Sequence, residues 1–167
     1  MSNSAGVQLG RKYDFDMVRP GISLYGGHSR VNEGEKYKNV VSLKAKIIQV
    51  RKIKAHETVG YGATFKANKP MVIGTIPMGY ADGFFRKFSD GTSFFVGQTK
   101  VRMIGRVSMD LVTLDLSNLK DQIINKTNFV EIINEKNNLN KLSKIVSTIP
   151  YEILTSLGNR YQRRYIG

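Results

Sequence analysis

The sequence predicts a mainly β fold, barrel-like or sandwich-like, that contains one helix. Three observations carry this prediction: short apolar runs rich in β-branched residues, turn residues between those runs, and a single stretch with helical spacing. Several short strands separated in this way are typical of barrels and sandwiches. We expect strands over residues 40–54, 71–78, 92–96, 100–104 and 107–116.

The first part of the chain is less regular. Apolar residues are few before position 30 except over 17–25, where Pro20 and Gly21 interrupt what reads as a short strand. The hydrophilic stretch 26–39 then reads as a linker. The β pattern begins after it.

Turn residues separate the expected strands. Asp82-Gly83 and Asp90-Gly91 supply the left-handed backbone positions that tight turns require. Residues 68–70 break the chain before the strand that begins at Met71.

One helix is expected near the end of the chain. Asn138 can cap it, and apolar residues follow on one helical face at Leu139, Leu142, Ile145 and Val146. The helix should end before Pro150, because the residue that precedes a proline avoids helical geometry.

Composition bounds the class of protein. With 167 residues of which 41% are hydrophobic, the chain can bury the core of one domain, or of one domain plus a piece of another. It has no apolar run of the roughly 20 residues that span a bilayer, and residues 1–13 lack the apolar stretch of a signal peptide, so we expect a cytoplasmic protein without a membrane partner. The absence of cysteine excludes disulfides and zinc-thiolate sites, and His28 and His56 are isolated, so no metal site is expected.

The charge favours a different reading. The net charge is +13, from 26 Lys and Arg against 13 Asp and Glu, which suits a nucleic-acid-binding protein. Between Lys44 and Lys54, however, the cations alternate with apolar residues, as in a strand with one solvated face. A further cluster, at Arg160, Arg163 and Arg164, lies near the end of the chain. A basic β-barrel that binds RNA or DNA is the alternative of another class, but the interleaved aromatic residues of such modules are missing, and we expect no nucleic-acid partner.

Four glycine-containing motifs carry a family resemblance. They are R-P-G-I-S-L-Y-G at 19–26, V-G-Y-G-A-T-F at 59–65, G-Y-A-D-G at 79–83 and G-R-V-S-M-D at 105–110. In this order they resemble the C-terminal part of bacterial alanine racemases, which depend on pyridoxal 5'-phosphate. The resemblance runs from Asn3 to Glu152 and so covers almost the whole chain.

The resemblance implies a domain organisation and an activity. Residues 1–30 would be the end of a (β/α)8 barrel that binds most of the cofactor, and residues 31–167 the C-terminal β-domain. The lysine to which the family attaches the cofactor lies near the start of the barrel, in a segment that this sequence does not contain, so we expect a fragment that is inactive alone. The whole enzyme would be a homodimer that interconverts L-alanine and D-alanine for peptidoglycan synthesis.

The resemblance also implies the catalytic base. Tyr61 would take the proton from the L face of the substrate in the partner subunit's site. A tyrosine has an ordinary pKa near 10, so it acts as a base at neutral pH only if nearby cations favour the phenolate or a partner takes its proton. Arg86 and Arg106 match family arginines that line the approach to the active site and are the candidates for this role.

Substrate and cofactor contacts follow in the same way. The backbone N–H of Met109 would bind the substrate carboxylate. Tyr80 would lie close to the substrate entry, and Asp110 would be a supporting residue at this entry. For the cofactor, Arg19 would face the pyridine nitrogen, and a guanidinium, being donor-only and always charged, keeps that nitrogen unprotonated. The cofactor phosphate would be bound by the Ser4 hydroxyl, the backbone N–H groups of Gly21 and Ile22, and the Tyr151 phenol.

Two departures from the common family pattern bear on specificity. Gly60 stands where a serine is frequent, and Ser-Met-Asp-Leu over 108–111 stands where Cys-Met-Asp-Gln is frequent. Neither removes a group with a direct chemical role. A serine racemase or a broad-specificity amino-acid racemase is therefore the alternative within the enzyme class.

Overall fold

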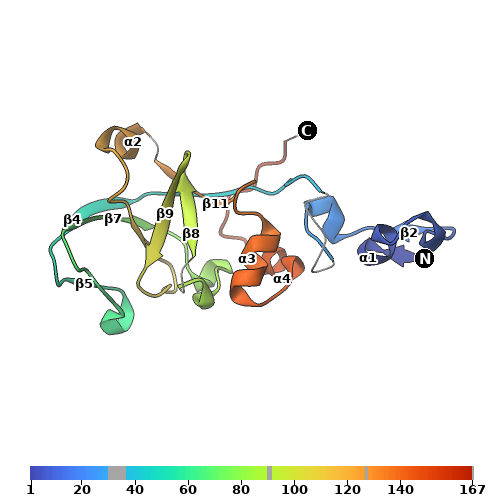
Figure 1. Ribbon diagram of the computed structural model, residues 1–167, viewed down its shortest axis with the longest axis horizontal. Coiled ribbons are helices and arrows are strands. Elements are labelled where there is room, and N and C mark those ends of the chain that lie inside the picture. The colour runs from blue at the N-terminus through green and yellow to red at the C-terminus, as the bar shows by residue number, and fades with distance from the viewer. Residues whose placement is uncertain (30–36, 90–91, 127, 167) are drawn as a thin grey trace. The chain divides into compact units, whose positions relative to one another are not determined.

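The computed structural model describes residues 1–29, 37–89, 92–126 and 128–166 (Figure 1). These residues form two compact units. The smaller consists of Met1–Ser42 with Ile133–Leu154, and the larger of Leu43–Ile132 with Thr155–Gly167. The domain division proposed at residue 30 stays a prediction.

A seven-stranded sheet forms the larger unit. Its strand order is β3-β11-β8-β9-β10-β7-β4, and the ladders between β11, β8, β9, β10, β7 and β4 are antiparallel. The strands are β3 Leu43–Lys46, β4 Gln49–Ile53, β7 Met71–Ile76, β8 Ser93–Val96, β9 Thr99–Ile104, β10 Val112–Asp115 and β11 Phe129–Ile133. A short helix, α2 Asp121–Lys126, precedes β11.

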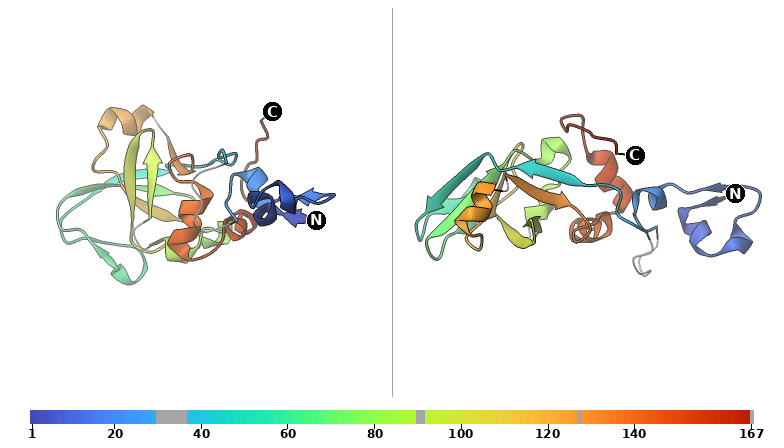
Figure 2. Two further views of the ribbon diagram at one scale, coloured as in Figure 1. Left: turned by 45° about the vertical axis from the view of Figure 1, so that its right-hand side comes forward. Right: turned by 90° about the horizontal axis from the view of Figure 1, so that it is seen from above.

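The sheet is curled into a half-barrel (Figure 2). Its two edge strands, β3 and β4, are joined by residues 47–48 alone. Because consecutive Cα atoms are 3.8 Å apart, the facing ends of these strands lie at most about 11 Å from each other. The sheet must therefore turn back toward its own first strand, and the barrel-like, mainly β prediction is confirmed.

Two strand predictions need correction, and one strand of the sheet was not predicted. The run 40–54 is two strands, because the chain changes partner between them: Ile47 N donates to Asn128 O, whereas Ile48 N donates to Thr75 O. The run 107–116 becomes a strand only at Val112, since a turn over 108–111 precedes it. Strand β11 was not predicted.

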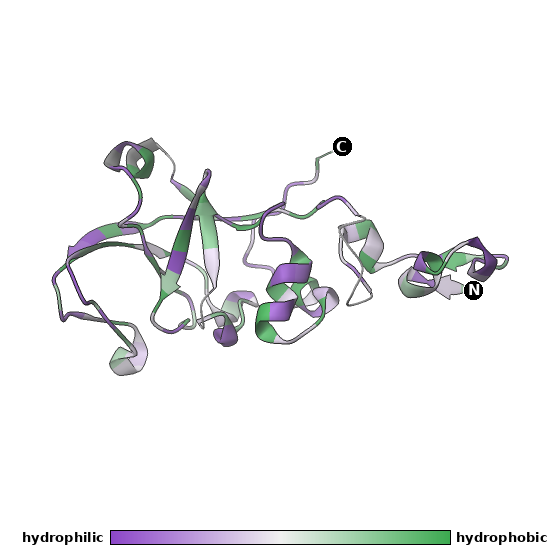
Figure 3. Ribbon diagram, viewed as in Figure 1, coloured by the Kyte–Doolittle hydropathy of each residue, from purple (hydrophilic) through white to green (hydrophobic). Residues whose placement is uncertain are grey.

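The core of the larger unit follows the alternation of its strands. In β8, Phe94 and Val96 are buried while Ser93 and Phe95 are partly exposed. Figure 3 shows hydrophilic residues along β9 beside the more hydrophobic β8. Burying a large apolar side chain contributes about 1.5–3 kcal/mol, so this one-sided pattern fixes which face of each strand points inward. The fully buried side chains of this core include Ile73, Ile76, Phe94, Leu114, Leu116 and Ile132.

A hairpin extends from the end of the sheet (Figure 1). Its strands, β5 Thr58–Val59 and β6 Phe65–Lys66, are antiparallel, and neither was predicted. Val59 belongs to a buried cluster with residues of β4, β7 and β9, against which Phe65 packs. The hairpin thereby rests on the sheet, and its turn carries Tyr61.

The smaller unit contains a parallel strand pair and most of the helices. β1 Ser2–Asn3 pairs with β2 Val18–Arg19, and α1 Ser4–Gln8 lies between them in sequence. Residues 22–25, expected to continue a strand, form a 3-10 helix instead. The remaining helices are α3 Leu139–Val146 and α4 Pro150–Ser156.

Helix α3 is the predicted helix, and it is confirmed in position and cap. The Asn138 side chain accepts a hydrogen bond from Lys141 N at 3.1 Å. Helices α1, α2 and α4 were not predicted. Helix α3 ends before Pro150 as predicted, and Pro150 itself begins α4, because the first helical position needs no N–H donor.

The turn expected at Asp82-Gly83 is confirmed, with Gly83 at φ 82°. The turn at Asp90-Gly91 and residues 30–36 of the expected linker lie outside the described residues. In the part of the chain that is described, no helix has the length and apolar character needed to cross a bilayer.

Candidate functional site

Tyr61 begins the turn between β5 and β6, and its side chain is 73% exposed. Gly60 and Gly62 have φ of 80° and 71°, which only glycine adopts readily. A Cβ on Gly60 would lie 3.1 Å from Arg106 N, and a Cβ on Gly62 would lie 3.5 Å from Arg106 Nη1. The backbone and the guanidinium of Arg106 therefore lie against the turn that presents the phenol.

Arg86 and Arg106 share a pocket. They line an open cavity of about 430 Å³ together with Lys87 and Ser89. The Ser89 hydroxyl donates to Arg86 O at 2.9 Å and accepts from Val107 N at 2.7 Å, so it joins the two arginine-bearing segments. The result is a cationic pocket that favours an anion.

Buried aromatic rings hold the Arg86 segment in place. Phe84 and Phe88 flank Arg86 in sequence, and their rings stack with centroids 4.4 Å apart. An adjoining cavity of about 360 Å³ is lined by residues of β6 and β9, and it too reaches Ser89 and Arg106.

Residues 79–83 and 108–111, which we name the loop pair, run in direct contact. Tyr80 N donates to Ser108 O at 3.1 Å, and Ala81 N donates to Met109 O at 3.0 Å. A Cβ on Gly79 would lie 2.2 Å from Met109 O, so only glycine permits this approach. The side chains of Tyr80 and Met109 are half exposed.

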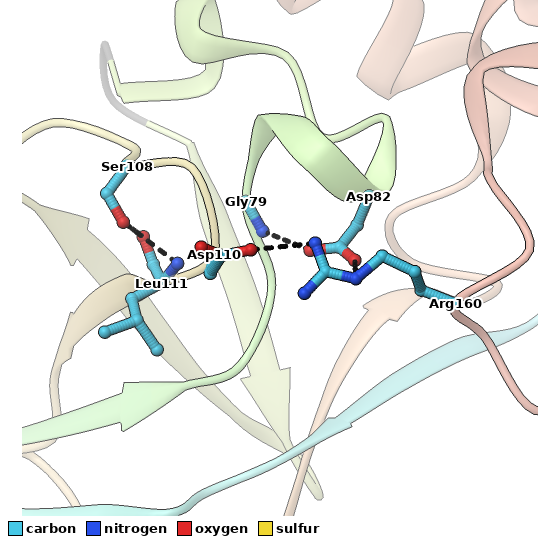
Figure 4. A network of polar contacts seen from close by, with 6 residues as sticks. All are labelled: Gly79, Asp82, Ser108, Asp110, Leu111 and Arg160. Carbon is cyan, nitrogen blue, oxygen red and sulfur yellow. Dashed lines mark hydrogen bonds and ion pairs between the residues drawn. The ribbon is translucent and has the colours of Figure 1, made fainter.

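A guanidinium links the carboxylates of the loop pair (Figure 4). Asp82 is 4% exposed, and its Oδ2 accepts from Gly79 N at 2.8 Å. Arg160 Nε lies 3.2 Å from Asp82 Oδ1, and Arg160 Nη1 donates to Asp110 Oδ1 at 2.8 Å. The hydrogen bond to Asp110 and the negative charge of Asp82 raise the pKa of Arg160.

Tyr161 lies next to this ionic group. Its hydroxyl is buried, and no described residue forms a hydrogen bond with it. Burial raises the pKa of the Tyr161 phenol, the charge of Asp82 raises it further, and Arg160 opposes the shift. The phenol therefore stays neutral beside the ion pair.

A second group of candidate residues gathers in the smaller unit, and we name it the cradle: Ser4, Gly21, Ile22 and Tyr151. The Ser4 hydroxyl oxygen accepts from Gly21 N at 2.8 Å. A Cβ on Gly21 would lie 1.8 Å from the Tyr151 hydroxyl oxygen. Two hydroxyls and the backbone at Gly21 thus converge from three places in the chain, a set of donors that suits a phosphate.

Arg19 lies on β2, opposite Asn3 of β1, with an exposed side chain. The structure describes no ion pair between Arg19 and another described residue. Among the described residues, no group of three His, Asp or Glu side chains is placed to hold a metal ion.

The structure therefore separates the expected residues into two sets. Those assigned to the cofactor lie in the smaller unit, and those assigned to the substrate and its protons lie in the larger unit. Asp82, Ser89 and Arg160 lie beside residues of the larger unit's set, and the sequence did not predict them as site residues. Asp82 read as a turn residue and Arg160 as one of several C-terminal cations, and no spacing in the sequence marks either as an ion-pair partner.

The curled sheet of the larger unit is the fold of a known class of β-domain. Residues 40–165 match the family model described as alanine racemase, C-terminal domain. Alanine racemases of Brucella canis and Rickettsia rickettsii are 44% and 42% identical over 99% and 100% of this chain. The chain belongs to the alanine racemase family, and it spans about 45% of the length of these relatives.

Solved structures agree with this assignment. The alanine racemase of Bartonella henselae, with covalently bound pyridoxal phosphate, is 38% identical with a TM-score of 0.87, and the match covers 99% of this chain and 46% of that one. The biosynthetic alanine racemase of Pseudomonas aeruginosa is 35% identical with a TM-score of 0.88, covering 99% and 47%.

Proposed function

We propose that this chain is the C-terminal part of a pyridoxal-phosphate-dependent alanine racemase that acts as a homodimer in the cytoplasm and supplies D-alanine for peptidoglycan. The observation that carries the proposal is the cradle. Ser4, Gly21 and Tyr151 come from three places in the sequence, yet the contacts at Gly21 bring them together, and these are the residues that the resemblance to alanine racemases implies as phosphate donors.

The cradle residues fit the phosphate of the cofactor. The Ser4 hydroxyl, the backbone N–H groups of Gly21 and Ile22, and the Tyr151 phenol would bind it, and the missing Cβ at Gly21 leaves the space. When bound, pyridoxal phosphate accepts the electrons left on the α-carbon after proton removal. Arg19 would donate to the ring nitrogen and keep it unprotonated, which weakens that electron demand and limits side reactions.

Racemization requires proton removal on one face of the α-carbon and proton delivery on the other. We assign removal on the L face to the Tyr61 phenol, acting in the partner subunit's site. Arg106 lies against the Tyr61 turn, and Arg86 shares the cationic pocket with it. Their positive charges make the surroundings of the Tyr61 turn cationic and suited to an anionic group.

The loop pair would bind the substrate. The backbone N–H of Met109 would donate to the substrate carboxylate, while the half-exposed Tyr80 side chain would flank the approach. Asp110 would support this arrangement through its position next to Met109.

The decisive experiment is Tyr61→Phe in the full-length protein. Loss of the phenol should slow L-to-D conversion by about 10²–10⁴-fold, because a positioned base contributes that much, while cofactor absorbance stays nearly unchanged. The measurement is loss of the α-proton signal of L-alanine in D₂O. Tyr165→Phe, at a phenol that is 92% exposed, is the matched control. Proton exchange at the wild-type rate in Tyr61→Phe would refute the assignment.

Substrate preference and the nucleic-acid alternative have separate tests. The ratio of kcat/KM for L-alanine to that for L-serine distinguishes an alanine racemase from a serine or broad-specificity enzyme. Titration with a fluorescent oligonucleotide at several salt concentrations tests whether the +13 charge binds nucleic acid, since phosphate contacts make such binding weaken steeply with salt. We expect no salt-dependent complex at physiological ionic strength.

A further inference from the structure

We propose that Arg160 is a positioning residue for the substrate-binding loops: it holds the two halves of the loop pair in fixed register through Asp82 and Asp110. This inference rests on the proposed racemase function and extends it to a residue from the C-terminal segment.

The guanidinium contacts one carboxylate from each loop. Arg160 Nε lies 3.2 Å from Asp82 Oδ1 and Arg160 Nη1 lies 2.8 Å from Asp110 Oδ1 (Figure 4). A guanidinium is planar and its N–H groups point in fixed directions, so two carboxylates bound to different nitrogens are also fixed relative to each other. A lysine ammonium lacks this geometry.

The two carboxylates are connected to the backbone of their loops in different ways. Asp82 Oδ2 accepts from Gly79 N, which orients the peptide group between Met78 and Gly79, next to Tyr80. Asp110 directly follows Met109, whose carbonyl accepts from Ala81 N. A displacement of the guanidinium would therefore reach the backbone on both sides of the proposed carboxylate-binding group.

Burial makes the Asp82 contact the stronger anchor. Asp82 is 4% exposed, and a buried carboxylate that loses its counter-ion is left uncompensated. The Asp110 and Arg160 side chains are 51% and 54% exposed, so solvent screens their pair and it adds little to stability. The ion pair between Arg160 and Asp110 therefore serves mainly to position the two loops.

Backbone exchange in this chain tests whether Arg160 holds the loops. In Arg160→Gln, hydrogen exchange at the Tyr80 and Ala81 amides should accelerate at least about tenfold, a change of about 1.4 kcal/mol in local opening. Arg163→Gln is the matched control, because that guanidinium donates to the backbone carbonyls of Leu157 and Gly158. Amides of the β7–β10 ladder should exchange equally in all variants.

Kinetics of the full-length protein test whether the loops position substrate. In Arg160→Gln, KM for alanine should rise about tenfold, the effect of losing one hydrogen bond to a charged group, with kcat changed less than about threefold. Arg160→Lys should recover only part of the loss. A merely structural role would lower thermal stability and leave KM unchanged.

Asp110→Asn covers the case in which Arg160→Gln does not fold, because it removes only the exposed pair and leaves Asp82 with its counter-ion. Faster Tyr80 and Ala81 exchange with raised KM in this variant supports the proposal. Exchange and KM equal to those of Arg163→Gln, in both Arg160→Gln and Asp110→Asn, overturn it. If the wild-type protein racemizes no amino acid, the proposed function fails, whereas the exchange data still decide whether Arg160 holds the loops.

Discussion

The cradle and the loop pair each place backbone groups with the help of one glycine, but the two glycines face different neighbours. A Cβ on Gly21 would meet the end of a side chain, the Tyr151 hydroxyl, at 1.8 Å, whereas a Cβ on Gly79 would meet a backbone carbonyl, Met109 O, at 2.2 Å. A tyrosine hydroxyl moves by rotation of its side chain, but a carbonyl moves only with its loop. Replacing the glycine should therefore weaken mainly ligand binding in the cradle, and mainly the stability of the fold in the loop pair.

The largest expected effect is that of Gly79→Ala. The added methyl group has no space unless both loops separate, so the free energy of unfolding should fall by about 3 kcal/mol, at the upper end for overpacking. Denaturant unfolding of this chain measures it. Gly158→Ala is the control, because a Cβ there lies 4.0 Å from the nearest atom and should change stability by less than about 0.5 kcal/mol. Equal stability of the two variants would remove the distinction between the regions.

An intermediate effect is expected from Gly21→Ala. Displacement of the Tyr151 hydroxyl should cost about 1 kcal/mol or less of stability, yet weaken pyridoxal-phosphate binding by the full-length protein about tenfold through loss of a phosphate donor. Absorbance titration with the cofactor and thermal unfolding separate the two quantities.

The Tyr151→Phe background sharpens this result. Removing the hydroxyl deletes the atom closest to the added Cβ, so Gly21→Ala should cost less stability there than in the wild type, a non-additive pair. Additive losses would mean that the two residues do not meet in solution.

The effect expected to be smallest at neutral pH concerns Tyr161, whose hydroxyl is buried. Its raised pKa means that the folded protein keeps a proton that the unfolded chain releases above pH 10, so stability falls as pH rises beyond 10, by up to about 1.4 kcal/mol per pH unit. Tyr161→Phe should remove this contribution. At pH 7 the Tyr161→Phe substitution should leave the free energy of unfolding unchanged or raise it slightly, because the hydroxyl has no described hydrogen-bond partner.

Denaturant unfolding between pH 9 and 11, with Tyr165→Phe as the exposed control, measures the difference. An identical alkaline slope in wild type and Tyr161→Phe would place the phenol in solvent.

Local signals in the sequence were sufficient where local forces decide the structure. Helix α3 was predicted because its cap, Asn138, and its apolar face lie within one short stretch. Residues 40–54 predict a single strand because their composition is uniform. The switch between Ile47 and Ile48 depends on partners at Asn128 and Thr75, and no local pattern reports a partner that distant.

The same limit applies to the candidate site. The family motifs identify Tyr61, Met109 and the cradle residues as candidates, and the roles of these residues stay predictions. They did not identify Arg160, because its role depends on contacts with two carboxylates, and the nearer of these is 50 residues earlier in the chain. The end of α3 before Pro150 was predicted correctly, but the helix that Pro150 begins was not, because proline is compatible with both the end and the beginning of a helix.

The position of Arg160 late in the chain has a consequence for synthesis. A ribosome releases both loops long before Arg160, and at about 5–20 residues per second the 50 residues after Asp110 take several seconds to add. During that interval Asp82 has no counter-ion and has reason to stay in water rather than in the protein interior. The loop pair therefore reaches its full stability only once the last part of the chain has emerged, and in a nascent chain truncated before Arg160 the two loops should open more often than in a completed chain.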